Sequence, residues 1–351
     1  MINRKSNVPL YIQLADLIRE QIRNGEIKVG DKLPSETEMI DLYRLGRLTI
    51  RDALSILVNE GILEKHHGKG TFCRTNAVTQ KFKVDVLLNL SDIYFSPYYL
   101  RSICGELESA NADIILSDTK NDIDVIYTHL EKALAEGSDG VIFQPPSEIS
   151  RAPQNFCELL ARLENAGIPY IMIDTFFENV PASYVIMDEV QAGKIAADYF
   201  VSLGHTSLCV IGQDLRVDSV LRLKGFSQAL DFEPYKINNS PELFKSIKTM
   251  LSEHKDITGI FCYHEGIAKK CYECLAELGI SIPDEISVIS VDDTIIASTL
   301  SPTLTSVIHP KEKLGTASAK AMMAILSKQI DWPYKKIFEP SLALRKSCRE
   351  I

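Results

Sequence analysis

From residue 82 onward, short apolar runs alternate with longer segments of helical periodicity. The apolar runs lie at 84–90, 114–116, 140–143, 170–173, 207–211, 259–262 and 286–291. The helical segments lie near 98–111, 123–136, 156–166, 218–230, 241–254 and 265–278. Repeated strand–helix units require a parallel sheet covered on both faces. Because the units form two successive sets, we predict an α/β body of two doubly wound lobes with a ligand cleft between their strand ends.

The first 75 residues follow a different pattern, which predicts three helices and a hairpin. The helices are expected over 9–24, 35–43 and 47–60, and the strands over 62–66 and 70–74. Ser35 and Glu38 have the spacing of a capping box, in which the hydroxyl accepts a backbone N–H and the carboxylate reaches back. This order of elements predicts a winged helix-turn-helix domain.

The third predicted helix displays Arg47, Thr49 and Arg51 at its N-terminal end. Helix N-termini favour phosphate, and a major groove is wide enough to admit a helix. The tip of the predicted hairpin consists of His67, Gly68 and Lys69. Such a wing often touches the minor groove or its phosphates. Each residue alone also fits a solvated or helix-capping role, but their combined order predicts DNA binding.

Four phrases of this segment resemble the GntR-family winged-helix domain over residues 8 to 73. They are PLYIQ at 9–13, GDKLPSE at 30–36, RLTIRDAL at 47–54 and GKGTF at 68–72. The resemblance implies the following DNA-contacting set: Arg4, Ser35, Glu36, Arg47, Thr49, Arg51, His67, Gly68 and Lys69. Gly46 departs from the family pattern, which usually has a serine there, so a hydroxyl cap or phosphate contact is missing.

The second part of the chain resembles the LacI/GalR type of effector domain, itself similar to periplasmic sugar-binding proteins, over residues 83 to 346. The phrases are SDGVI at 138–142, GIP at 167–169, GH at 204–205, RLKGF at 222–226, IPDEISVI at 282–289 and PTLTSV at 302–307. Together with the GntR-like head and FEPSL at 338–342, they resemble the arabinose-operon repressors of low-GC bacteria. The resemblance implies a repressor that binds double-stranded operator DNA as a homodimer and is released by a small sugar, L-arabinose first.

The same resemblance implies an effector site built from both lobes. Its expected members are Tyr94, Phe95, Gln144, Asp174, Arg222, His264, Glu265 and Asp292. Charged planar groups satisfy paired sugar hydroxyls, and an aromatic ring packs on the apolar face of a sugar. His264 and Glu265 stand where the family usually has Asn-Asp, so another pentose, a hexose or a sugar phosphate stays open as the effector.

The expected division of the chain is a DNA-binding domain over 1–75, a linker over 76–82 and an effector domain over 83–346. We expect the first lobe to contain 83–187 with 309–328, and the second to contain 188–308 with 329–346. The formal net charge of −9 follows this division, since residues 1–75 hold 12 Lys and Arg against 10 Asp and Glu, and the remainder holds 26 against 37. The acidity therefore belongs to the second part, and DNA contact depends on local placement of charge.

Other protein classes fit the sequence less well. A nucleotide-dependent enzyme of this architecture would need a glycine-rich turn after its first strand, and residues 89–95 contain no glycine. The eight cysteines offer one CxxC, at 271–274, without a second pair at ligand spacing, so we expect no metal, cofactor or catalysis. No long apolar run or leader-like segment is present, which favours the cytoplasm over membrane insertion or a periplasmic receptor. An aminotransferase body would need a longer chain.

Overall fold

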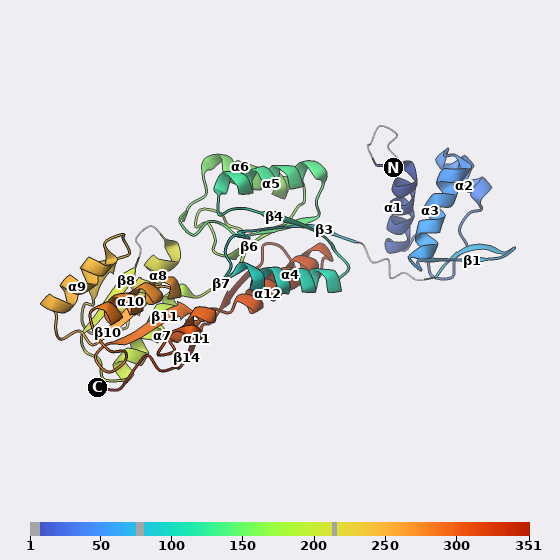
Figure 1. The fold of residues 1–351 in the computed structure, drawn as a ribbon. Helices are drawn as coiled ribbons and strands as arrows, with labels where there is room; N and C mark the ends of the chain where they lie inside the picture. Colours follow the sequence, from blue (N-terminus) through green and yellow to red (C-terminus); the bar gives the residue numbers. More distant parts are fainter. Residues whose placement is uncertain (1–7, 75–80, 213–215) are drawn as a thin grey trace. The chain divides into compact units, whose positions relative to one another are not determined.

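The computed structural model describes residues 8–74, 81–212 and 216–351. The chain divides into two compact units, residues 1–80 and 81–351 (Figure 1). Most of the expected linker, 76–82, lies outside the described residues. No helix in the described part of the chain is long and apolar enough to span a membrane.

The first unit is a three-helix domain with a two-stranded hairpin. Its elements are α1 (Leu10–Arg23), α2 (Glu36–Tyr43), α3 (Arg47–Asn59), β1 (Leu63–His66) and β2 (Gly70–Cys73). The apolar stripes of the helices close one small core, formed by Leu14, Ile18, Met39, Ile50 and Leu57 among others. The strands pair antiparallel, with Leu63 opposite Cys73 and His66 opposite Gly70. The fold is the predicted winged helix-turn-helix.

The first lobe of the second unit is a six-stranded parallel sheet with helices on both faces. In sheet order, its strands are β13 (Lys335–Phe338), β7 (Ser183–Met187), β6 (Tyr170–Asp174), β5 (Gly140–Phe143), β3 (Lys83–Leu88) and β4 (Asp113–Asp118). Helices α5 (Ile123–Glu136) and α6 (Gln154–Asn165) cover one face. Helices α4 (Ser96–Ser109) and α12 (Lys311–Leu326) cover the other (Figure 1).

The second lobe repeats this plan. Its sheet order is β14 (Ser341–Ala343), β12 (Thr305–Ile308), β11 (Ser287–Asp292), β10 (Gly259–Cys262), β8 (Leu208–Gly212) and β9 (Tyr235–Asn238). Only β14 runs antiparallel to its neighbour among these described strands. Helices α7 (Glu189–Ser202) and α8 (Val217–Gln228) pack on one face. Helices α9 (Leu243–Glu253) and α10 (Glu265–Glu277) pack on the other, and α11 (Ile295–Thr299) follows β11.

One predicted lobe boundary is wrong. We expected all of 329–346 in the second lobe, but β13 pairs in parallel with β7 of the first lobe, from Lys335 opposite Tyr184 to Phe338 opposite Met187. The chain therefore crosses between lobes three times, after β7, after β12 and after β13. The sequence pattern for this strand is weak because β13 is a largely exposed edge strand that begins with two lysines.

Candidate functional site

A cleft of about 420 Å³ lies between the strand ends of the two lobes. All eight residues of the expected effector site line it. The first lobe contributes Tyr94, Phe95, Gln144 and Asp174, and the second contributes Arg222, His264, Glu265 and Asp292. They are far apart in sequence, and the carboxyl ends of parallel strands place them together.

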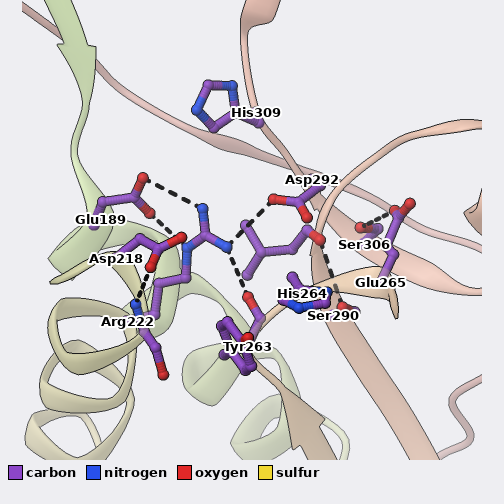
Figure 2. Close-up of polar contacts among 12 residues, drawn as sticks. Glu189, Asp218, Arg222, Tyr263, His264, Glu265, Ser290, Asp292, Ser306 and His309 are labelled. Carbon is purple, nitrogen blue, oxygen red and sulfur yellow. Dashed lines mark hydrogen bonds and ion pairs between the residues drawn. The ribbon is translucent and has the colours of Figure 1, made fainter. Parts of the chain in front are cut away.

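Arg222 of α8 lies at the centre of the second-lobe wall. Its Nε donates to Glu189 Oε2 at 2.6 Å and its Nη2 to Glu189 Oε1 at 3.3 Å. Its Nη1 donates to the carbonyl oxygen of Tyr263 at 2.7 Å and to Asp292 Oδ1 at 3.3 Å. Figure 2 shows the guanidinium between the two carboxylates. Four of the five N–H donors of the guanidinium are therefore hydrogen-bonded to residues that the structure describes. In this arrangement, one N–H of Arg222 is left for a ligand.

The two carboxylates beside Arg222 share an unusual electrostatic environment. Burial raises the pKa of Glu189 to about 7, and the charge of Arg222 opposes this shift. Burial likewise raises the pKa of Asp292 to about 7, against the same guanidinium. Each side chain is at most one-tenth exposed. Near neutral pH, protonation of this cluster therefore changes the number of acceptors available to a ligand.

Asp174 forms the opposite wall, at the end of β6. Tyr99 Oη donates to its Oδ1 at 2.8 Å, and Gln144 Nε2 donates to its Oδ2 at 2.8 Å. His309 Nε2 lies 3.0 Å from Oδ1. Burial alone would raise the pKa of Asp174, but the close contact with His309 and the hydrogen bonds from Tyr99 and Gln144 lower it to about 2. Asp174 is therefore a fixed, ionised acceptor.

The backbone at two of these aspartates is left-handed. Asp174 has φ of 74° and Asp292 has φ of 120°. Residues other than glycine rarely adopt such angles, and they do so mainly where the surrounding structure over-determines them at functional sites. Both aspartates end a buried parallel strand and turn into the cleft.

His264 and Glu265 begin α10, and their polar atoms are partly engaged within the protein. His264 Nδ1 accepts from the N–H of Gly266 at 2.9 Å as the helix cap, which leaves Nε2 as the donor nitrogen. Burial lowers the pKa of His264 to about 3, so the ring is neutral. Glu265 Oε1 accepts from Ser306 Oγ at 2.8 Å, and Oε2 accepts from the N–H of Thr294 at 3.0 Å. Glu265 therefore organises the cleft wall, and its oxygens are already hydrogen-bonded.

The aromatic residues of the first lobe differ in exposure. Tyr94 is 39% exposed. Phe95 meets the ring of His309 edge-on, with centroids 5.1 Å apart, and the Lys311 ammonium lies 4.9 Å from its centroid. Tyr94 is therefore the more accessible ring at the cleft.

Sequence reasoning missed several residues of the cleft. Glu189 follows β7, a strand that the apolar pattern did not indicate. Arg216 precedes α8, and its guanidinium binds Asp218 at 3.0 and 2.7 Å and reaches Glu148 of the first lobe at 3.2 Å. The N–H of Val217 also donates to the carbonyl oxygen of Ser147 at 3.0 Å. These two contacts join the lobes at the edge of the cleft.

The winged-helix unit displays most of its expected DNA-contacting residues at the surface. Arg47 and Arg51 of α3 and the hairpin tip at 67–69 are exposed, and Thr49 is half-buried. Ser35 accepts from the N–H of Glu38 at 3.3 Å, and Glu38 accepts from the N–H of Ser35, which confirms the capping box. Gly46 is the N-cap of α3 and provides no side-chain cap. Arg4 lies outside the described residues.

Glu36 is bonded to two cations of this surface. Arg51 Nε donates to Glu36 Oε2 at 2.8 Å, and Lys65 Nζ of the hairpin lies 3.6 Å from Oε1. The hydrogen bond from Arg51 lowers the pKa of Glu36. Sequence reasoning did not single out Lys65, which is an exposed residue of β1. Glu36 therefore connects α2, α3 and the hairpin through their side chains.

The described residues provide no cluster of three or more His, Cys, Asp or Glu side chains arranged to hold a metal ion. All eight cysteines are free thiols, and both members of the CxxC are buried in α10. Burial raises the pKa of Cys274 to about 11, which disfavours its reactive thiolate form.

Comparison with known proteins matches both units. Residues 10–73 match the bacterial regulatory proteins of the gntR family, and residues 197–348 match the periplasmic binding protein-like domain. The chain is 29% identical to an arabinose metabolism transcriptional repressor of Geobacillus stearothermophilus, an alignment that covers 99% of this chain and 100% of the relative. It is 28% identical to the repressor of the same name from Halalkalibacterium halodurans, with 95% of each chain covered.

Solved structures share the fold. The transcriptional regulator CelR in complex with cellobiose has a TM-score of 0.64 and 18% identity, covering 90% of this chain and all of that one. The lac repressor dimer bound to operator has a TM-score of 0.65 and 19% identity, covering 78% of this chain and 96% of that one. Both similarities concern the arrangement of elements.

Proposed function

We propose that this chain is a sugar-responsive transcriptional repressor. Its first unit matches the gntR family of bacterial regulatory proteins, and its second unit matches the periplasmic binding protein-like domain. The observation that supports it most is the coexistence of an exposed basic face on α3 with a polar cleft that gathers eight residues from both lobes. The full-length similarity to arabinose repressors agrees with this pairing. Those relatives are regulators, so we assign no enzymatic activity.

The charge of the cleft favours a neutral sugar. Seven carboxylates line it: Asp92, Asp174, Asp188, Glu189, Asp218, Glu265 and Asp292. The two arginines that line it, Arg216 and Arg222, are already paired with carboxylates. Among the described residues that line the cleft, no guanidinium is left without a carboxylate partner, so a phosphate group would face mainly acidic side chains. L-Arabinose is therefore our first candidate, another pentose or a hexose is the alternative, and a sugar phosphate is disfavoured.

The proposed mechanism links the two ligands. Two copies of the chain would set two DNA heads on the half-sites of a near-palindromic operator, and sugar binding between the lobes would weaken that complex. Reciprocity requires operator DNA to weaken sugar binding by the same factor, typically about 5- to 150-fold. Unchanged sugar affinity in the presence of operator would contradict this mechanism.

Two measurements test the function with the full chain. In a thermal-shift screen against L-arabinose, D-xylose, D-ribose, hexoses and their phosphates, only a neutral sugar should raise the melting temperature.

The second measurement concerns DNA binding. The wild-type protein should enrich particular duplexes from a random library and retain them. Arg47→Ala and Arg51→Ala should each weaken retention about 10- to 100-fold while leaving the sugar response intact. Arg162→Ala, an exposed arginine of α6, is the control. The function is wrong if no duplex is enriched.

A further inference from the structure

We propose that Glu189 is a positioning residue that holds Arg222 in its effector-binding orientation and ties it to a crossover between the lobes. This inference rests on the proposed function. Glu189 is the first residue of α7, and only Asp188 separates it from the end of β7. The strand belongs to the first-lobe sheet, whereas α7 packs in the core of the second lobe. Glu189 therefore lies where the chain passes from one lobe to the other.

The crossover at Glu189 is tied to a second crossover. The N–H of Asp188 donates to the carbonyl oxygen of Phe338 at 3.0 Å, at the end of β13. The Asp188 side chain caps α7 by accepting from the N–H of Gln191 at 2.9 Å. The backbone on the N-terminal side of Glu189 is thus fixed to the first lobe, while its side chain binds Arg222 of the second lobe.

Helices α7 and α8 approach each other closely through glycines. A Cβ atom at Gly193 would lie 1.8 Å from the carbonyl oxygen of Arg222, and one at Gly225 would lie 1.8 Å from that of Val190. Neither distance is compatible with a side chain, so backbone packs on backbone at both points. Glu189 lies one turn before Gly193, and Arg222 contributes its own carbonyl oxygen to the crossing, so the ion pair joins the two helices where they pack most closely.

The pair has the geometry of a bidentate clamp in a buried site. Both oxygens of Glu189 accept from Arg222, at 2.6 and 3.3 Å, and the side chains are 10% and 3% exposed. This contact fixes the plane of the guanidinium. Its Nη1 then meets the ends of β10 and β11 at Tyr263 and Asp292, and the remaining N–H belongs to Nη2 (Figure 2). Without Glu189, the guanidinium would be free to rotate toward Asp218, whose carboxylate lies close enough to interact with its charge.

Two variants and a control test the assignment in the full chain. Glu189→Gln keeps the shape but removes the charge, and should weaken L-arabinose binding about 10- to 100-fold, since hydrogen bonds to charged groups are the strong ones. Glu189→Asp keeps the charge and should recover part of this loss.

Operator binding gives a second readout for the same variants. In the absence of sugar, the operator affinity of Glu189→Gln should stay within about two-fold of the wild-type value, and the sugar concentration needed to release the DNA should rise. Glu242→Gln, which removes an exposed carboxylate paired with Lys245, should change none of these values. Equal arabinose affinity in the wild type and Glu189→Gln would overturn the proposal.

A crystal structure of Glu189→Gln without ligand decides the matter independently of the sugar. The expected result is an Arg222 guanidinium that has left the carbonyl oxygen of Tyr263. If the guanidinium keeps its place, Glu189 does not position it. If the wild type binds no sugar at all, the proposed function fails, while this structure still tests the role of Glu189.

Discussion

Arg51 of the third helix donates its Nε–H to Glu36 of the second helix at 2.8 Å, on the surface that we propose faces DNA. An acidic residue among cations lowers the general attraction to phosphate, but this one holds the Arg51 guanidinium through its Nε, while the Arg51 side chain stays 56% exposed. Base recognition depends on direction, whereas phosphate attraction depends mainly on charge.

Glu36→Gln should therefore reduce discrimination between operator and random DNA. Removing one negative charge strengthens binding to any duplex, and releasing Arg51 weakens recognition of the correct base. We expect the ratio of specific to non-specific affinity to fall about three- to ten-fold, measured by fluorescence anisotropy at several salt concentrations. Glu60→Gln makes the same charge change in a pair with Arg19 and should leave the ratio unchanged.

The contact between Arg216 and Glu148 predicts a small effect on sugar retention. It joins the two lobes at 3.2 Å with side chains 27% and 40% exposed, so it is a partly solvated ion pair. Glu148→Gln should increase the sugar dissociation rate about two- to five-fold at low salt, and less at 0.5 M salt, in stopped-flow measurements. Glu131→Gln breaks a pair of the same length within the first lobe and should have no effect. An equal change in both variants would contradict a role in holding the lobes together.

The pKa of Asp292, raised to about 7 by burial, predicts the direction of a pH effect on stability. Between about pH 4 and 7 the folded protein binds a proton that the unfolded chain releases, so this group's contribution to stability is lost as pH rises toward 7. Asp292→Asn removes the effect. Its unfolding free energy relative to wild type should therefore increase from pH 5 to pH 8 in urea titrations. Asp198→Asn, on the exposed side of α7, is the control for the loss of a carboxylate from the same lobe.

The close crossing of α7 and α8 predicts a large loss of stability. Gly193→Ala would place its Cβ 1.8 Å from a backbone oxygen, and should destabilise the body by about 3 kcal/mol or more, visible as a lower denaturation midpoint. Gly105→Ala is the matched control, because this helical glycine has no atom within 4 Å of the added Cβ. That change should be neutral or stabilise the protein by up to about 1 kcal/mol. Similar behaviour of the two variants would mean that the crossing adjusts easily.

The elements that could be predicted from sequence are those with a local signal. The Ser35–Glu38 capping box and the α5 span of 123–136 agree with the structure because side-chain chemistry and periodicity determine them along a single stretch. The eight residues expected at the effector site were predicted from motifs at strand ends, and all eight line the cleft. Their hydrogen-bond partners were not readable, because Glu265 is satisfied by Ser306, 41 positions away, and Arg222 by Glu189, 33 positions away.

The lobe assignment failed for a related reason. β13 has two lysines and an exposed face, so its pattern resembles a loop, and its place in the first sheet depends on long-range pairing with β7. Glu189 was missed because β7 itself was not recognised. Edge strands and crossovers are where tertiary pairing outweighs local pattern.

The final stretch of the chain supplies an outer strand to each lobe, β13 to one and β14 to the other. A nonsense mutation shortly before codon 335 would therefore remove the outermost strand of both sheets at once. β7 and β12 would become exposed edge strands that can pair with strands of other protein molecules. Neither half can be produced as an uninterrupted gene fragment. Truncated alleles of this regulator should accumulate as aggregates and not as functional half-proteins.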